Sequence, residues 1–192
     1  MSHPITKMKK TNQVTIALTD PKTPSNVGSI MRAAGNYNVD QVIYSGKRYA
    51  HAAKFHRTEH STDTRNMLNK IPLTAVDDFV HIKDLLENIA STTKIICVDL
   101  VEGAIPLPHF THPEQAVYIF GPEDGTISQE VIDCADDVVY VPTTGCMNLA
   151  ASVNVLLYDR LAKSSAMKIG NQQADNELIR KSRDTNNTAK VR

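Results

Sequence analysis

Six short apolar runs along the chain have the length and the β-branched content of buried strands. They are residues 13–18, 41–44, 71–76, 94–100, 116–120 and 138–141. Segments with the spacing of amphipathic helices follow several of these runs, after Asn26 and at residues 77–90, 128–135 and 148–163. Repeated strand–helix units favour a parallel sheet. The pattern therefore predicts an α/β fold, with a mostly parallel sheet flanked by helices on both faces.

Residues 138–161, VVYVPTTGCMNLAASVNVLLYDRL, form the most informative stretch. A strand ends at Pro142, and a turn-rich loop through Gly145 leads into a helix that Asn148 opens. One side of the helix is predicted to carry Leu149, Val153, Leu156, Leu157 and Arg160, with Asp159 and Lys163 on its other side. Small residues beside a helix N-terminus let a ligand approach free backbone N–H groups. An ordinary strand-to-helix connection would have the same pattern.

Prolines and glycines place the loops. Pro21 and Pro24 predict that no helix begins before Asn26, and the proline-rich residues 105–113 predict a surface loop. A dinucleotide-binding or class I methyltransferase domain would have a glycine-rich loop after the first strand. The turn here has a single glycine, Gly28, so that class of fold is disfavoured.

Composition limits the protein class. With 192 residues, 41% hydrophobic and 22% charged, the chain is expected to form one globular domain at residues 13–163, after an N-terminal segment 1–12. It has no apolar run of membrane-spanning length and no secretory signal at its start, so a cytoplasmic protein without a membrane partner is expected. Three scattered cysteines argue against disulfides and metal sites, and Cys97 is predicted to lie in the core.

The net charge is zero, with 21 basic and 21 acidic residues, so any RNA-binding face depends on how charge is distributed. Residues 45–69 gather basic, histidine and aromatic side chains: Lys47, Arg48, Lys54, Arg57, Arg65, His51, His56, His60, Tyr49 and Phe55. This mixture suits phosphate contact and base stacking, although a solvated surface helix is an equal alternative. Residues 56–60, HRTEH, match an inverted zinc-peptidase signature, which we reject because no second segment supplies the remaining ligand.

The tail, residues 164–192, is polar and carries six basic residues against three acidic ones: Lys168, Arg180, Lys181, Arg183, Lys190 and Arg192 against Asp175, Glu177 and Asp184. Its composition allows loose RNA contact and is equally typical of a disordered tail without function.

Three motifs in order carry a family resemblance. They are Asn26, Gly28 and Arg32; then Phe120, Gly121, Glu123 and Gly125; then Val141, Pro142, Cys146, Met147 and Asn148. Over residues 12–163 the chain resembles the SpoU-type (TrmH-like) branch of the SPOUT RNA methyltransferases. It departs from that pattern at Cys146, where a serine is common, and in a shorter loop before Asn148.

The resemblance implies a C-terminal trefoil knot, a homodimer and methyl transfer from S-adenosyl-L-methionine to RNA, with no metal. It implies a cofactor pocket formed by Leu100, Gly121, Val141, Cys146, Met147 and Asn148. Asp99 is a further candidate for the rim of that pocket, because it ends a buried strand. Arg32 is the expected catalytic residue, with Asn26 orienting it or the substrate and Glu123 bonding loop backbone groups.

The expected reaction is 2′-O-ribose methylation of tRNA more than of rRNA. The alternatives are base methylation and a non-catalytic RNA-binding protein of the same fold. The chain has no P-loop and no nucleophile elbow, so its chemistry must depend on positioning the reactants.

Overall fold

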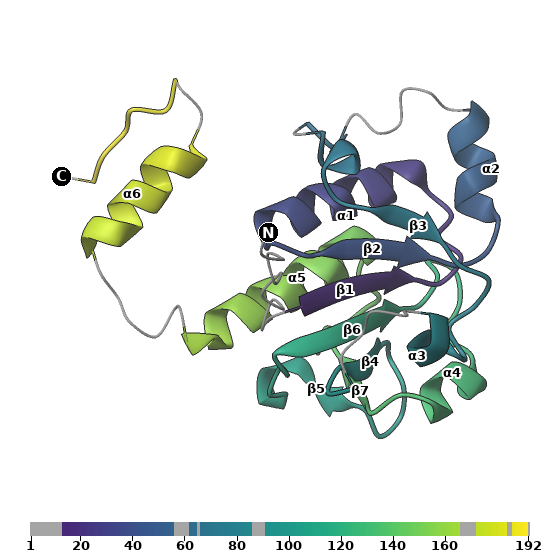
Figure 1. Cartoon of the computed structure of the whole chain (residues 1–192). Helices are drawn as coiled ribbons and strands as arrows, with labels where there is room; N and C mark the ends of the chain where they lie inside the picture. Colours follow the sequence, from purple (N-terminus) through teal and green to yellow (C-terminus); the bar gives the residue numbers. More distant parts are fainter. Residues whose placement is uncertain are drawn as a thin grey trace, which may run out of the picture.

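The computed structural model describes residues 13–55, 62–64, 66–85, 91–165, 172–183 and 186–191 (Figure 1). The strands are β1 Gln13–Leu18, β2 Gln41–Tyr44, β3 Leu73–Ala75, β4 Lys94–Val98, β5 Ile105–Pro106, β6 Gln115–Phe120 and β7 Asp137–Tyr140. The α-helices are α1 Pro24–Asn36, α2 Arg48–Phe55, α3 Ile82–Leu85, α4 Gln129–Asp133, α5 Leu149–Lys163 and α6 Gln172–Ser182. Two 3₁₀ helices are η2 Met67–Asn69 and η3 Leu107–His109.

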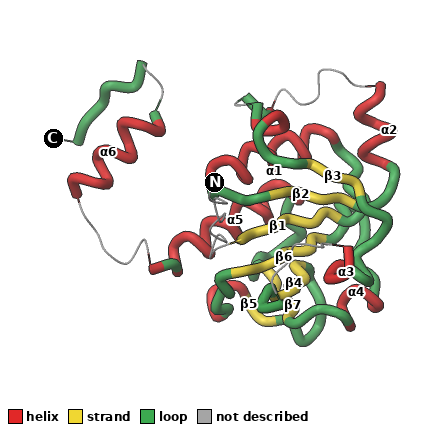
Figure 2. The backbone as a smooth tube through the Cα atoms, viewed as in Figure 1, coloured by secondary structure: helices red, strands yellow, loops and turns green. Residues whose placement is uncertain are grey.

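The strands form one sheet in the order β3-β2-β1-β6-β4-β7-β5 (Figure 2). Each neighbouring pair is parallel, which confirms the α/β prediction. In a parallel sheet the carboxyl ends of all strands lie at the same edge. The loops that follow β1, β2, β4, β6 and β7 therefore meet at that edge, although they begin as far apart in the sequence as the ends of β1 at Leu18 and of β7 at Tyr140.

The core has two halves, one on each face of the sheet. Alternate residues of β4 show this division, because Ile96 and Val98 pack in the half covered by α1 and α5, while Ile95 and Cys97 pack in the half covered by α3 and α4. Figure 1 shows these helix pairs on opposite faces, as predicted. Cys97 is buried, as expected, and burial raises the pKa of its thiol to about 12. It is therefore an uncharged core residue.

Two predicted helix boundaries are wrong. α1 begins at Pro24, two residues before Asn26, with Thr23 as its N-cap residue. Proline is tolerated there because the first N–H groups of a helix have no intrahelical partner. The helix predicted over residues 77–90 begins later, because α3 covers Ile82–Leu85. Before it, Asp78 Oδ1 accepts a hydrogen bond from the Val80 N–H at 2.9 Å. Residues 86–90 lie outside the described residues.

The predicted surface loop at residues 105–113 is also wrong. Ile105 and Pro106 form the edge strand β5, where a missing N–H costs little, and Leu107 and Phe110 are buried. In the tail, α6 lies apart from the sheet (Figure 1). The division into segments 1–12, 13–163 and 164–192 stays a prediction, and residues 1–12 lie outside the described part. None of the described helices is long and apolar enough to span a bilayer.

Candidate active site

A cavity of about 130 Å³ opens at the carboxyl edge of the sheet. Its walls come from the ends of β4 and β6, from the loops that follow β4, β6 and β7, and from the first turn of α5. They are Val98, Asp99, Leu100, Phe120, Gly121, Pro122, Glu123, Gly125, Val141, Thr143, Cys146, Met147, Leu149 and Ser152. The structure thus joins three loops that are distant in the sequence into one pocket.

Five of the six residues predicted to hold a cofactor line this cavity: Leu100, Gly121, Val141, Cys146 and Met147. The sixth, Asn148, lies next to it as the N-cap of α5, where its Oδ1 accepts hydrogen bonds from the Ala150 and Ala151 N–H groups. Leu100 is 53% exposed at the rim, which is high for a large apolar side chain. An apolar ring bound in the cavity could cover it.

Gly121 is held against Asp99. A Cβ at position 121 would lie 2.5 Å from Asp99 Oδ2, closer than side-chain atoms approach one another. Asp99 cannot easily move away, because its Oδ1 accepts from the Leu100 N–H at 2.8 Å and its Oδ2 from the Ile127 N–H at 2.9 Å. Asp99 therefore joins the loops after β4 and β6. Glycine at position 121 avoids a clash with Asp99 and lets a ligand approach the backbone closely.

Glu123, Asn26 and Asn148 form a chain of hydrogen bonds across the three motifs. Glu123 accepts from the backbone N–H groups of Lys22 at 2.7 Å and Thr23 at 3.1 Å, and from Asn26 Nδ2 at 3.1 Å. Asn26 Oδ1 in turn accepts from Asn148 Nδ2 at 3.0 Å. The prediction that Glu123 bonds loop backbone groups is consistent with this geometry. The Asn26 amide is engaged with Glu123 and Asn148 rather than with Arg32.

Arg32 does not line the cavity. It is exposed on α1, between positions whose side chains are buried in the core. Within the described part of the chain, its guanidinium has no hydrogen bond or ion pair. It is therefore available to an external ligand, but a single chain does not bring it into the pocket.

Arg48, predicted as an RNA contact, instead ties three loops together at the same edge. Its Nη1 donates to both carboxylate oxygens of Asp124, at 2.7 and 2.9 Å, and its Nε and Nη2 donate to the Asp20 carbonyl. The Arg48 hydrogen bond lowers the pKa of the Asp124 carboxyl below its usual range. Asp20 has a positive φ of 38°, which directs its carbonyl and carboxylate toward Arg48. No local sequence signal identifies this contact.

The predicted stacking role of Tyr49 is wrong. Its ring is 6% exposed and packs edge-to-face on Tyr44, with centroids 4.9 Å apart. Burial raises the pKa of Tyr49 to about 12, and the ring anchors α2 to the domain. His56, Arg57, His60 and Arg65 lie outside the described residues. Among the residues that are described, no group of three His, Cys, Asp or Glu side chains could hold a metal ion.

Comparison with known proteins gives one family and a shared fold. The model of the SpoU rRNA Methylase family matches residues 13–158. The SpoU methyltransferase AviRb from Streptomyces viridochromogenes, solved in complex with the cofactor AdoMet, is 19% identical with a TM-score of 0.67 over 81% of this chain and 59% of that chain. The chain thus spans less than two thirds of the length of AviRb.

Two other solved structures match most of their own length. The TrmH/SpoU tRNA modifying enzyme of A. aeolicus is 16% identical with a TM-score of 0.62, over 88% of this chain and 87% of that one. A structure concerned with the 2-OH methylation of C/U34 on tRNA is 18% identical with a TM-score of 0.66, over 80% of this chain and 97% of that one. At these identities the likeness establishes the fold. No curated protein matches the sequence.

Proposed function

Because the chain belongs to the SpoU rRNA methylase family, we propose that it transfers a methyl group from S-adenosyl-L-methionine to a ribose 2′-hydroxyl of RNA. The observation that carries this proposal is the cavity itself. It gathers loops from the second and third motifs, and the Asn26–Glu123 and Asn26–Asn148 hydrogen bonds tie the first motif to them.

The residues of the cavity fit that cofactor. Gly121 leaves room for a ligand to approach the backbone, and the exposed Leu100, with Val141 and Met147, offers apolar surface for an adenine ring. When bound, S-adenosyl-L-methionine supplies a methyl carbon that its sulfonium already makes electrophilic. The protein then has to align the acceptor and manage one proton. Cys146 and the shortened loop before Asn148 allow this role, since Cys146 still lines the cavity.

We assign Arg32 to the acceptor rather than to the cofactor. A guanidinium stays protonated at neutral pH and is therefore a poor proton acceptor. Its fork can instead hold an RNA phosphate and stabilise the ribose 2′-oxygen as that oxygen loses its proton. Asn26 and Glu123 then act as positioning residues for the loop that precedes α1.

A homodimer would complete this site, because Arg32 is exposed outside the cavity of its own chain. The proposed contact is α5, which packs beside α1 and exposes Val155, Tyr158 and Leu161 at three-residue spacing. A second protomer on this face would bury these side chains, and α1, which carries Arg32, packs beside α5. Size-exclusion chromatography with light scattering tests the dimer, and a monomer at micromolar concentration would contradict it.

We propose tRNA, in the cytoplasm, as the substrate. Two solved structures of the same fold have names that mention tRNA, which supports this choice. Methylation of rRNA is the second candidate, in keeping with the family's name. Base methylation is disfavoured because the first motif carries an arginine. A non-catalytic RNA-binding protein would not need a cofactor cavity, so the cavity disfavours that alternative.

Two measurements test the proposal. Mass spectrometry of tRNA and rRNA nucleosides, from cells with and without the gene, should show one 2′-O-methylated nucleoside that disappears with the gene. A missing base-methylated nucleoside would instead identify the alternative reaction. Calorimetry should show that the purified protein binds S-adenosyl-L-methionine, and no binding would contradict the enzymatic role.

A further inference from the structure

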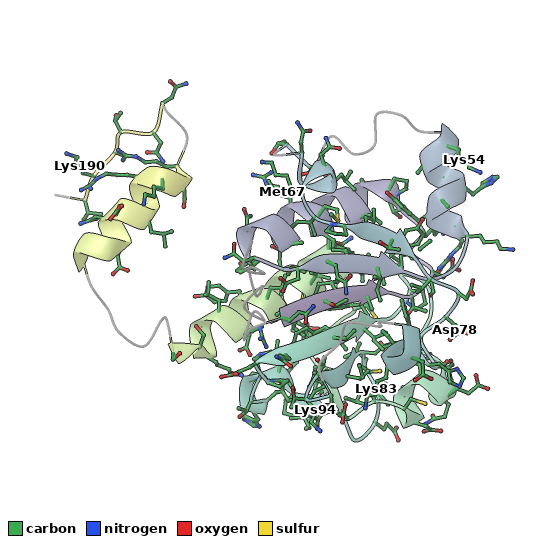
Figure 3. All side chains as sticks on the ribbon, viewed as in Figure 1. Lys54, Met67, Asp78, Lys83, Lys94 and Lys190 are labelled. Carbon is green, nitrogen blue, oxygen red and sulfur yellow. The ribbon has the colours of Figure 1, made fainter. Side chains whose placement is uncertain are left out.

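The helix α2 carries basic charge that nothing in its own sequence neutralises. Residues 46–58 contain Lys47, Arg48, Lys54 and Arg57 and no acidic residue, in a chain whose net charge is zero. The structure divides the described members of this set into two groups. Arg48 is committed to Asp20 and Asp124, whereas Lys47 and Lys54 are exposed and have no ion pair with any described residue. Figure 3 shows Lys54 on the outer side of α2.

The position of α2 connects this charge to the cavity. α2 follows the carboxyl end of β2, so it begins at the edge of the sheet where the cavity opens. The Arg48–Asp124 pair fixes its first turn to the loop of residues 121–125, which forms one wall of the cavity. Lys47 directly precedes α2, where its carbonyl accepts a hydrogen bond from the His51 N–H, and Lys54 lies in the last turn of the helix. Roughly 10 Å of helix separates these two exposed lysines, which define the Lys47–Lys54 side of α2.

Tyr49 keeps this arrangement in place from the other side of the helix. Its ring is buried and packs on Tyr44, which turns the Lys47–Lys54 side toward solvent. Lys22 adds a third exposed ammonium at the same edge, with a 3.5 Å contact to Asp124. Asp20, Glu123 and Asp124 place negative charge nearby, but Arg48 and the loop backbone already engage their carboxylates.

We infer that Lys47 and Lys54 form a phosphate-binding side of α2 that holds the backbone of the substrate RNA beside the mouth of the cavity. This inference rests on the proposed function, because it takes RNA as the ligand. It predicts sequence-independent contacts, which position an RNA but do not select its bases. Stacking plays no part in it, since Tyr49 is buried.

The test is RNA binding by the double variant Lys47→Gln/Lys54→Gln, measured with total tRNA and total rRNA as probes at 50 to 200 mM salt. Glutamine has nearly the helix propensity of lysine, so α2 should remain folded. Loss of two phosphate contacts should weaken RNA binding on the order of tenfold at 0.1 M salt and reduce the salt slope by about 1.4 to 1.8. S-adenosyl-L-methionine affinity should not change.

The matched control is Lys70→Gln, an exposed lysine that precedes β3 and therefore lies at the opposite edge of the sheet. It should leave RNA affinity and salt slope unchanged. If the double variant binds RNA like the wild type, the inference is wrong while the proposed function stands. If the wild type binds neither tRNA nor rRNA, both the inference and the proposed function are wrong. If the wild type binds RNA but not S-adenosyl-L-methionine, methyl transfer fails, and the response of the double variant still decides the role of α2.

Discussion

Asn148 Nδ2 donates a hydrogen bond to Asn26 Oδ1 at 3.0 Å, across 122 residues of sequence. The orientation of both amides follows from their neighbours. An ionised Glu123 can only accept, so Asn26 turns its Nδ2 toward it and its Oδ1 toward Asn148. Asn148 must then donate to Asn26, which leaves its Oδ1 to accept from the Ala150 and Ala151 N–H groups. One side chain thus caps α5 and joins two motifs.

These two roles of Asn148 can be separated by substitution. Asn148→Ala removes both and should lower the free energy of unfolding by about 1 kcal/mol or more, since an N-cap is lost. Asn148→Asp keeps an N-cap acceptor but cannot donate to Asn26, so it should retain most of the stability while S-adenosyl-L-methionine binds more weakly. Urea unfolding and calorimetry measure the two effects. Wild-type cofactor affinity in Asn148→Asp would show that the Asn26 contact does not shape the cavity.

Two of the glycines near the cavity, Gly121 and Gly145, should respond differently to alanine. At Gly121 a Cβ would overlap the Asp99 carboxylate, so Gly121→Ala should cost about 1 to 3 kcal/mol of stability and weaken cofactor binding. At Gly145 a Cβ would meet nothing within 4 Å, and this glycine does not line the cavity. Gly145→Ala should therefore stay within about 0.5 kcal/mol of the wild type. Equal effects at both positions in urea unfolding and calorimetry would contradict the assigned contact.

Arg32→Lys and Arg32→Ala should abolish methyl transfer while leaving cofactor affinity within a few fold. Arg32 lies outside the cavity, and lysine cannot reproduce the planar fork of a guanidinium. Loss of a donor that stabilises a developing oxyanion costs about 10² to 10³ in rate. Incorporation of labelled methyl groups into RNA measures the first effect and calorimetry the second. Equal losses of activity and cofactor affinity would disprove this division of roles.

The parts of the fold that depend on short-range patterns could be predicted from sequence. The continuous apolar content of β4 and of β6 predicts strands, and Asn148 is recognisable as an N-cap because its signal lies within three residues. Five cofactor candidates converge on one cavity because each follows a strand of a parallel sheet. Topology alone then brings them together.

The missed features depend on contacts between distant residues or on exceptions to local rules. The Asn26–Glu123 bond spans 97 residues, and the Arg48–Asp124 pair spans 76. Neither leaves a periodic signal in the sequence. A proline fits within a strand at the edge of a sheet, as Pro106 does in β5. The local sequence does not show that this segment is an edge strand.

A buried polar network under the end of α5 predicts how stability depends on pH. Asp159 and Lys163, predicted on the outer side of the helix, are instead half-buried, and Asp159 Oδ2 lies 2.9 Å from His112 Nε2. His112 Nδ1 lies 2.7 Å from the Tyr118 hydroxyl, which accepts from Arg160 Nη1 at 2.9 Å. While it accepts from Arg160, the hydroxyl can donate its own proton to Nδ1. A neutral His112 with its proton on Nε2 satisfies every partner.

Protonation of His112 would break this arrangement, because Nδ1 could no longer accept from Tyr118. Burial lowers the pKa of His112 below its usual 6.5, and Arg160 and Lys163 add to that shift, although the Asp159 carboxylate opposes it. In the unfolded chain the same histidine takes up a proton near its usual pKa. Below about pH 6.5 the unfolded state thus binds more protons than the folded state, and the protein should lose stability as the pH falls.

His112→Gln tests this account by urea unfolding at pH 5, 6, 7 and 8. The variant should be less stable than the wild type at pH 8, because Gln cannot make both hydrogen bonds, but its stability should fall less steeply between pH 7 and 5. A single titrating group can contribute at most about 1.4 kcal/mol per pH unit to that slope. His109→Gln, at an exposed histidine of η3, serves as the control and should keep the wild-type slope. If His112→Gln has the same slope as the wild type, the buried network does not set the pH dependence.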